Sequence, residues 1–216
     1  MHVIICAGGP EEEVAERDIL LSFDDAVFIG ADHGTIYLLD KGIIPTMAVG
    51  DFDSLTIEEW QRVEREVKTI ERHEPEKDET DTELAIIRAL EMKPQKITVT
   101  GATGGRLDHY ESNLHLVYRL QKEAPNCSIR LMNKTNEVRF ILPGTSRLPY
   151  DQRYKYMSFF AFGREVPDVT LKGVAYETHS ELVQMGTTRF TSNEVISASA
   201  TVSFSEGALL MIRSND

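Results

Sequence analysis

The sequence predicts an α/β fold: an N-terminal parallel-sheet nucleotide-binding domain followed by a C-terminal antiparallel β-sandwich. Over residues 1–125, short apolar runs alternate with segments of helical periodicity, which is typical of a parallel sheet covered by helices. From residue 126 onward, alternating strand-like runs are separated by turns that carry Gly, Pro, Asn and Asp, as in a sandwich. The change of period near Pro125 therefore predicts domains at residues 1–125 and 126–216.

The elements of the first domain follow from its apolar pattern. Short apolar runs predict parallel strands at Val3–Ala7, Ala26–Ala31, Met47–Gly50, Lys68–Arg72 and Lys96–Thr100. Helical spacing between these runs predicts helices over residues 34–41, 56–67, 80–90 and 107–122. Thr80 and Glu83 match a capping box at the start of the third helix. The acidic run Glu11–Glu13 is expected to be a solvated helix start.

The second domain is predicted from runs with strand-like alternation. Strands are expected at residues 156–162, 195–204 and 208–213, and in the runs "SIRLMN" and "EVRFIL". Met157, Phe159, Phe160 and Phe162 are expected to lie in the core of the sandwich.

Composition limits the classes of partner. The chain has 216 residues, of which 41% are hydrophobic and 27% charged, an ordinary globular balance. Its formal net charge of −12 argues against a nucleic-acid binder, which needs a basic face to displace the counterions of phosphates. A small polyphosphate ligand stays possible, because a divalent cation can bridge carboxylates and phosphate.

The sequence also carries expectations about the compartment. It contains no run of about 18 apolar residues, so no membrane span is expected. Cys6 and Cys127 suggest neither a disulfide framework nor a zinc site. We therefore expect two reduced thiols in a cytoplasmic protein.

Four polar clusters follow predicted strands of the first domain. They are Asp32-His33-Gly34, Asp51-Phe52-Asp53-Ser54, Asp78–Asp81 and Gly101–His109. Ligands of open α/β sheets bind at the carboxyl ends of the strands. The four clusters are therefore expected to converge on one ligand site.

The paired aspartates suggest a site for a hard cation. Mg²⁺ is usually held by one or two carboxylates together with phosphate oxygens and water, and Asp51 and Asp53 would supply such carboxylates. An ordinary turn is the alternative for this pair, since Asp and Ser are common turn residues. For Asp78 and Asp81 the alternative is the first turn of a helix, where the macrodipole favours acids.

The segment "GATGGRLDHYESN" predicts an anion site. Its glycines lie between a strand and a helix, where backbone N–H groups can approach an anion. The segment is neither a Walker A loop nor the dinucleotide-binding G-x-G-x-x-G. Arg106 could contact phosphate, and Asp108 could bind a metal or the substrate. His109 and Asn113 would share one helix face, although a surface histidine without a role is the alternative for His109 alone.

Taken in order, five segments resemble the thiamine pyrophosphokinase family. They are "GADHG" (30–34), "GDFDS" (50–54), "DETD" (78–81), "GATGGRLDH" (101–109) with Asn113, and "TSNE" (191–194). The resemblance implies an α/β domain followed by a β-sandwich, in a homodimer that holds thiamine between the α/β domain of one chain and the sandwich of the other. It also implies transfer of a pyrophosphoryl group from ATP to the hydroxyethyl oxygen of thiamine, which gives thiamine diphosphate and AMP.

The resemblance also implies roles for individual residues. Mg²⁺ bound to ATP would neutralise a set of aspartates: Asp51, Asp53, Asp78 and Asp81. The transfer site would be lined by Asp81, Arg106, Asp108 and His109. The nucleotide would be bound by Asp32, His33, Gly34, Ser54, Thr80, Gly101, Gly104, Gly105 and Asn113. Ser192 and Asn193 would hold thiamine from the partner chain.

The chain departs from the family pattern in two places. His33 stands where the family usually has glycine, and Val174-Ala175-Tyr176-Glu177-Thr178 stands where it often has Leu-Lys-Tyr-Pro-Leu. Two other functions are alternatives to thiamine pyrophosphorylation. A metal-dependent DxD transferase of nucleotide sugars would need a larger acceptor domain and leaves the glycine-rich loop without a role. A non-catalytic nucleotide-sensing module would keep the fold, and His33 is the one feature that favours it.

Overall fold

The computed structural model describes residues 1–74, 76 and 78–216, and it divides into two compact units. The first unit is Met1–Lys134 and the second is Thr135–Asp216. The division falls later in the chain than the sequence boundary at residue 125, because the strand that follows the last helix belongs to the sheet of the first unit.

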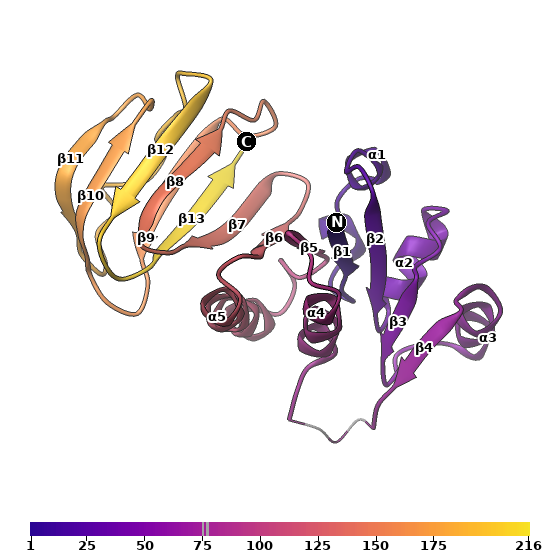
Figure 1. The fold of residues 1–216 in the computed structure, drawn as a ribbon. Helices are drawn as coiled ribbons and strands as arrows, with labels where there is room; N and C mark the ends of the chain where they lie inside the picture. Colours follow the sequence, from indigo (N-terminus) through magenta and orange to yellow (C-terminus); the bar gives the residue numbers. More distant parts are fainter. Residues whose placement is uncertain (75, 77) are drawn as a thin grey trace. The chain divides into compact units, whose positions relative to one another are not determined.

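The sheet of the first unit has six parallel strands in the order β4-β3-β2-β1-β5-β6 (Figure 1). Their bounds are β1 (His2–Cys6), β2 (Ala26–Ala31), β3 (Met47–Gly50), β4 (Thr69–Arg72), β5 (Lys96–Thr100) and β6 (Ser128–Met132). Five of them confirm the predicted parallel strands. The sixth is the run "SIRLMN", which pairs in parallel with β5 instead of joining the sandwich. A short apolar run does not reveal which sheet it joins, since its periodicity is the same in both.

Helices cover both faces of this sheet. They are α1 (Arg17–Leu21), α2 (Gly34–Asp40), α3 (Ile57–Glu66), α4 (Asp81–Glu91) and α5 (Leu107–Glu123), with a 3₁₀ turn η1 at Glu11–Glu13. Figure 1 shows α2 and α3 on one side of the sheet and α4 and α5 on the other. The four predicted helices are confirmed, whereas α1 was not predicted. Among the described residues, no helix combines the length and apolar character needed to cross a bilayer.

Two threonine caps set where helices begin. The Thr56 hydroxyl accepts a hydrogen bond from the Glu59 N–H, and the Glu59 carboxylate accepts one from the Thr56 N–H, so a complete capping box starts α3. At α4 the Thr80 hydroxyl accepts from the Glu83 N–H as predicted. The Glu83 carboxylate, however, pairs with Arg119 of α5, so this side chain connects α4 to α5.

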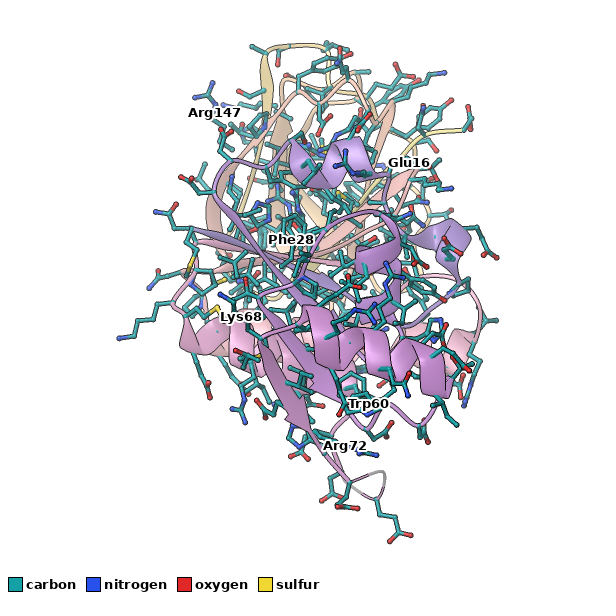
Figure 2. The ribbon with its side chains drawn as sticks, turned by 90° about the vertical axis from the view of Figure 1, so that its right-hand side faces the viewer. Glu16, Phe28, Trp60, Lys68, Arg72 and Arg147 are labelled. Carbon is teal, nitrogen blue, oxygen red and sulfur yellow. The ribbon has the colours of Figure 1, made fainter. Side chains whose placement is uncertain are left out.

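The outer edge of the sheet is fixed by an aromatic cluster. Phe52 follows β3 and is buried against Trp60 of α3, with ring centroids 5.1 Å apart. The Arg72 guanidinium of β4 lies 5.3 Å from the centre of the Trp60 ring, and Figure 2 labels these two side chains next to each other. Phe52 has a φ of +59°, a costly conformation for an aromatic residue, which this packing holds in place.

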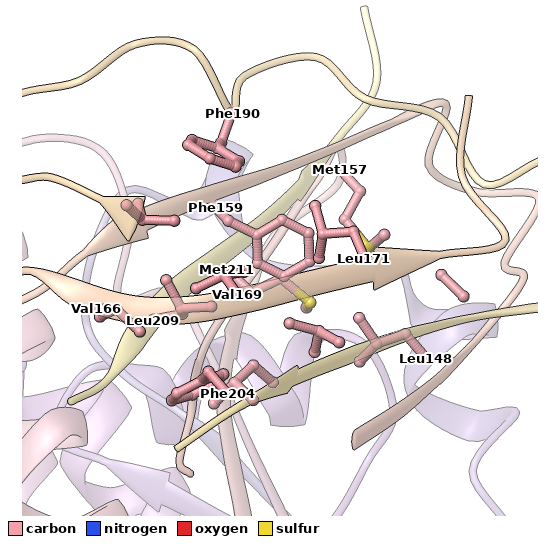
Figure 3. Close-up of a cluster of buried hydrophobic side chains, with 14 of the residues drawn as sticks. Leu148, Met157, Phe159, Val166, Val169, Leu171, Phe190, Phe204, Leu209 and Met211 are labelled. Atoms are coloured by element: carbon pink, nitrogen blue, oxygen red, sulfur yellow. The ribbon is translucent and has the colours of Figure 1, made fainter. Parts of the chain in front are cut away.

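In the second unit, antiparallel strands in the orders β7-β13-β9 and β11-β10-β12-β8 form the two layers of a sandwich. Their strands are β7 (Asn136–Ile141), β8 (Gly144–Pro149), β9 (Tyr156–Ala161), β10 (Val166–Lys172), β11 (Thr178–Val183), β12 (Ser199–Phe204) and β13 (Leu209–Ser214). Buried side chains from both sheets form one core, as Figure 3 shows for Phe159 and its neighbours. The predicted sandwich is therefore confirmed.

The core of the second unit differs in detail from the prediction. Met157 and Phe159 are buried, whereas Phe160 and Phe162 are only half-buried. Phe160 alternates with Phe159 along β9 and so points to the other face of its sheet, where Phe162 and Phe140 pack edge to face. The strand predicted at 195–204 begins only at Ser199, and Val195 makes an isolated bridge to Val174.

Candidate active site

A pocket lies where the strand order of the first unit reverses. From β1 the chain builds β2, β3 and β4 on one side and later adds β5 and β6 on the other. Such a switch point leaves a crevice at the carboxyl ends of the two central strands, here β1 and β5. A pocket of about 710 Å³ occupies this place, and it is lined by segments that follow β1, β2 and β5 and by the start of α4.

Two glycine-containing turns meet at the pocket. The Ala7 N–H donates to the Thr100 carbonyl at 2.8 Å, and the Gly9 N–H donates to the Gly101 carbonyl at 2.9 Å. A Cβ atom on Gly9 would lie 2.2 Å from the Gly101 oxygen, so only glycine allows the turns to approach this closely.

The turn after β1, Ala7–Pro10, lines the pocket but was missed by the sequence reasoning. Its signal was "AGGP" directly after a strand. Tyr37 of α2 also lines the pocket and was missed, because a single tyrosine in an amphipathic helix resembles a core residue.

The structure brings most of the predicted site residues of the first unit to this pocket. The lining includes Asp32, Thr80, Asp81, Gly101, Gly104, Gly105, Arg106, Asp108, His109 and Asn113. The predicted residues of the first unit outside the lining are His33, Gly34, Asp51, Asp53, Ser54 and Asp78. Ser192 and Asn193 belong to the second unit.

Asp32 is the most unusual carboxylate of the pocket. It follows β2 with a φ of +47°, and its Oδ2 accepts a hydrogen bond from the Ser54 hydroxyl at 2.8 Å. Its Oδ1 is buried and has no hydrogen-bond partner within the described part of the chain. Burial raises the pKa of Asp32, hydrogen bonds from Ser54 and the His33 N–H oppose the rise, and the carboxylates of Asp81 and Asp51 add to it.

Asp51 and Asp81 thus both act electrostatically on Asp32, and the three residues are called the acidic cluster below. Asp53 is exposed, and its N–H donates to Asp51 Oδ1 at 3.1 Å, while Asp78 is also exposed. Within residues 1–74, 76 and 78–216, no group of three or more His, Cys, Asp or Glu side chains is arranged to hold a metal by itself. Carboxylate oxygens, including the orphaned Asp32 Oδ1, suit a hard cation whose remaining ligands come from a phosphate and water.

A charged pair stands at the start of α5. The Arg106 guanidinium donates to both carboxylate oxygens of Asp108, at 2.6 Å and 3.1 Å. This hydrogen-bonded pairing lowers the pKa of Asp108 to about 2, so the carboxylate is ionised at neutral pH. The side chains are 70% and 64% exposed, and both residues line the pocket. Arg106 is therefore a cation at the pocket that an incoming anion could draw away from Asp108.

Asn113 ties the glycine-rich turn to α5. Its Nδ2 donates to the Ala102 carbonyl at 3.0 Å. His109 and Asn113 both line the pocket, which confirms that they share one helix face. The N-terminal turns of α5 thus supply Arg106, Asp108, His109 and Asn113 to one wall.

His33 and Gly34 play different parts at the start of α2. His33 has a φ of −59°, so its position does not need the conformations that only glycine adopts. Its ring packs edge-on against Tyr37, with centroids 4.9 Å apart, and thereby backs a pocket residue. A Cβ atom on Gly34 would lie 2.0 Å from the Cys6 carbonyl oxygen, so this glycine allows α2 to pack on the end of β1.

In the second unit, the side chain of Asn193 shapes a turn. Asn193 is buried, its Oδ1 accepts from the backbone N–H groups of Tyr176 and Glu194, and its Nδ2 donates to the Tyr176 carbonyl. The Tyr176 ring is 72% exposed on that turn. Ser192 is exposed at a φ of +56°, and its N–H donates to the Ser158 hydroxyl at 3.0 Å.

Family models match both units. The model of the thiamin pyrophosphokinase catalytic domain matches residues 20–129. The model of the thiamin pyrophosphokinase vitamin B1 binding domain matches residues 145–209. Each match lies within one of the two compact units.

Individual relatives match along the whole chain. The sequence is 40% identical to the thiamine pyrophosphokinase of Bacillus subtilis over 214 residues, 98% of each chain. The crystal structure of a Bacillus subtilis thiamine pyrophosphokinase aligns with a TM-score of 0.92 at 38% identity and covers all of both chains. That of Geobacillus thermodenitrificans aligns with a TM-score of 0.89 at 37% identity, over 100% of this chain and 98% of the other. The yeast enzyme, at 13% identity and a TM-score of 0.76, shares the fold.

Proposed function

This chain belongs to the thiamin pyrophosphokinase family, and we propose that the pocket of its first unit is where the reaction of that family takes place. The reaction is the transfer of a pyrophosphoryl group from ATP to thiamine. The observation that carries the proposal is the position of the pocket: it lies at the switch point of a parallel sheet, and ten of the predicted site residues line it. The family match favours this enzyme over a nucleotide-sugar transferase and over a non-catalytic sensor.

The proposed phosphate site is the wall formed by the two glycine turns and the start of α5. Backbone N–H groups at a helix N-terminus favour an anion, and Gly104 and Gly105 line the pocket beside that helix. Arg106 adds a guanidinium that can bind two phosphate oxygens at once. Asn113 holds the turn in place through the Ala102 carbonyl.

We propose that the acidic cluster holds Mg²⁺ together with ATP. The support is chemical, because a buried carboxylate oxygen without a partner and two further carboxylates suit a hard cation that phosphate also binds. When bound, the ion would neutralise phosphate charge. Asp32, Asp51 and Asp81 are expected to contribute most to metal binding. The exposed Asp53 and Asp78 are expected to contribute less.

The residues of the pocket would act mainly by positioning and charge stabilisation, as in other phosphoryl transfers. The hydroxyethyl oxygen of thiamine forms a bond to the β-phosphorus of ATP. The bond from that phosphorus to the oxygen bridging to the α-phosphorus breaks, AMP leaves with the oxygen, and the hydroxyl proton is lost. Asp81, Arg106, Asp108 and His109 are the side chains proposed to surround the reacting groups.

We propose that the second unit binds thiamine, and that two chains form a homodimer with composite sites. The match of residues 145–209 to a vitamin B1 binding domain supports the first point, and the family resemblance supports the second. Ser192 and the turn that Asn193 holds are the proposed contacts. The free thiols of Cys6 and Cys127 fit a cytoplasmic enzyme.

The function is tested by incubating the chain with ATP, thiamine and Mg²⁺ and measuring AMP and thiamine diphosphate. Both products should form in equal amounts, and excess chelator should stop their formation. Nucleotide binding without AMP would instead support the sensor, and AMP that forms without thiamine diphosphate would contradict the transfer.

Composite sites are tested by mixing two inactive variants, Asp81→Ala and Asn193→Ala. Activity should return after subunit exchange, because the heterodimer has one intact site. A mixture that exchanges subunits yet stays inactive would rule out composite sites.

A further inference from the structure

A three-residue hydrogen-bonded link lies behind the glycine-rich turn of the pocket. Glu13 Oε2 accepts a hydrogen bond from Asn133 Nδ2 at 2.6 Å and one from the Thr103 hydroxyl at 3.5 Å. Asn133 Nδ2 also donates to the Thr103 hydroxyl at 3.0 Å. Thr103 and Asn133 are both buried. Glu13 therefore differs from the exposed Glu11 and Glu12 beside it, and the predicted solvated helix start is wrong for this residue.

The same segment packs directly on the turn. A Cβ atom on Gly104 would lie 2.7 Å from Cγ of Glu13, and one on Gly105 would lie 3.0 Å from Cγ of Pro10. Both glycines have positive φ values, +80° and +65°, which other residues rarely adopt. Pro10 and Glu13 therefore pack against two glycines, the residue type with the widest choice of backbone conformations.

The link is separate from the pocket surface. Gly104 and Gly105 line the pocket, whereas Glu13, Thr103 and Asn133 do not. Any effect of Glu13 on a bound ligand is therefore indirect. A carboxylate that accepts hydrogen bonds from buried donors makes a stronger and more rigid connection than a neutral acceptor.

We propose that Glu13 is a positioning residue that, with Asn133 and Thr103, fixes the turn Thr103–Gly105 so that its backbone N–H groups meet the phosphates of ATP. This role rests on the proposed function of the pocket. Thr103 is the point of attachment, because it is the residue of the turn that bonds to both other members of the link. Loss of the link leaves the chemistry of the pocket intact but lets two glycines sample other conformations.

The experiment compares steady-state kinetics of Glu13→Ala, Glu13→Gln, Asn133→Ala and the double variant Glu13→Ala/Asn133→Ala with the parent. For Glu13→Ala we expect the KM for ATP to rise about tenfold, kcat to fall less than about threefold, and the KM for thiamine to stay unchanged. This is the pattern expected when ATP binding is weakened equally in the ground and transition states. Glu13→Gln keeps an oxygen acceptor and should recover most of the ATP affinity. The double variant should be no worse than Glu13→Ala, because the residues act as one unit.

Glu12→Ala is the matched control, since Glu12 is an exposed neighbour in the same 3₁₀ turn, and its KM for ATP should not change. If Glu13→Ala does not fold, Thr103→Val carries the test with an expected rise of about threefold in the KM for ATP. An unchanged KM for ATP in the folded variant, or effects of Glu13→Ala and Asn133→Ala that multiply, would overturn the proposal.

Direct titration with the non-cleavable analogue α,β-methylene-ATP separates this proposal from the proposed function. A parent chain that binds the analogue but forms no AMP from ATP and thiamine would refute the function. Weaker analogue binding by Glu13→Ala, by about tenfold, would still support the link. Equal binding by the parent and the variant would refute the link.

Discussion

One cluster of charged side chains in each unit shows an opposite arrangement of charge. In the acidic cluster of the first unit, the charges that act on Asp32 are those of Asp81 and Asp51, and they raise its pKa. In the second unit, ion pairs join Arg139 to Glu137 and Arg153 to Asp151, and the charge of Arg213 acts on Asp151. These five residues are called the paired cluster. Burial alone would raise the pKa of Asp151, but hydrogen bonds from Arg153 and the charges of Arg153 and Arg213 lower it overall. The paired cluster of the second unit therefore neutralises its charges internally, whereas the acidic cluster of the first retains a charge imbalance that a ligand can neutralise.

The acidic cluster lowers the stability of the folded chain and serves ligand binding, whereas the paired cluster stabilises the fold. Ionised Asp32 destabilises the folded chain at neutral pH, because its folded-state pKa lies above its usual value. Such a cost is expected at a binding site. In the second unit Arg213 and Glu137 are buried cross-strand partners, and Arg213 also donates to the Pro149 carbonyl at 2.8 Å. Those contacts hold the strands of the sandwich together.

The largest effect is expected for Asp32→Asn. Removing the charge should lower kcat/KM by about a hundredfold or more, which corresponds to about 2.7 kcal/mol of transition-state stabilisation. The melting temperature of the ligand-free chain should stay the same or rise, because a repelled carboxylate is replaced by a neutral group of the same shape. Kinetics and calorimetry on the same preparation give both values. A variant that loses stability and keeps its activity would show that Asp32 serves the fold and not ligand binding.

The counterpart in the second unit is Arg153→Met. Arg153 donates to both oxygens of Asp151, and the two side chains are only 30% and 22% exposed. Breaking a buried pair costs about 3 to 5 kcal/mol, and partial exposure reduces the expected loss here to about 2 kcal/mol.

Activity of the folded Arg153→Met variant should stay within about threefold of the parent. Arg164→Met serves as the control for denaturant unfolding, because the exposed Arg164–Glu206 pair should contribute less than about 1 kcal/mol. Equal losses of stability in the two variants would show that the paired cluster contributes no more than a surface pair.

Mild acid should weaken the first unit through His2. Its Nε2 lies 2.8 Å from the Thr98 hydroxyl, and burial, with the nearby charge of Arg130, lowers its pKa to about 4. An unfolded histidine takes up its proton near pH 6.5, so the folded state loses stability as the pH falls from 6.5 towards 4. Between pH 7 and 5.5 the expected loss is about 1 kcal/mol.

The variant His2→Asn should flatten this pH dependence, as denaturant unfolding at the two pH values can measure. The same slope in parent and variant would assign the acid sensitivity to other groups.

The smallest effect is expected for His33→Gly. In the parent, the ring of His33 packs against Tyr37 from outside the pocket. The KM for ATP should change by about two- to fourfold while kcat is nearly retained, as when binding is altered equally in the ground and transition states. A large fall in kcat with an unchanged KM would give His33 a direct role in the transition state.

The sequence predicted the local elements of the fold but not the neighbours of each strand. Thr80 and the glycines at 101–105 could be placed because capping and turn chemistry are local. The turn Ala7–Pro10 was missed because its importance depends on β1 lying beside β5, a long-range pairing. For the same reason β6 was expected among the antiparallel strands although it pairs in parallel with β5, since β-strand periodicity does not specify a partner.

The candidate site was predictable to a similar degree. Asp32 was expected to bind nucleotide, and only the structure shows its buried, orphaned oxygen beside the other acids. Glu13 appeared as part of an ordinary acidic run, because its partner Asn133 is distant in sequence. Burial and partner choice depend on tertiary packing and have no local signal.

Metal-bound ATP is proposed to neutralise the charge imbalance of the acidic cluster, and one titration tests this directly. The affinity for α,β-methylene-ATP is measured by calorimetry with and without Mg²⁺, for the parent and for Asp32→Asn. Mg²⁺ should tighten analogue binding to the parent by about tenfold or more, and this gain in affinity should disappear in Asp32→Asn. The same Mg²⁺-dependent gain in both chains would contradict it.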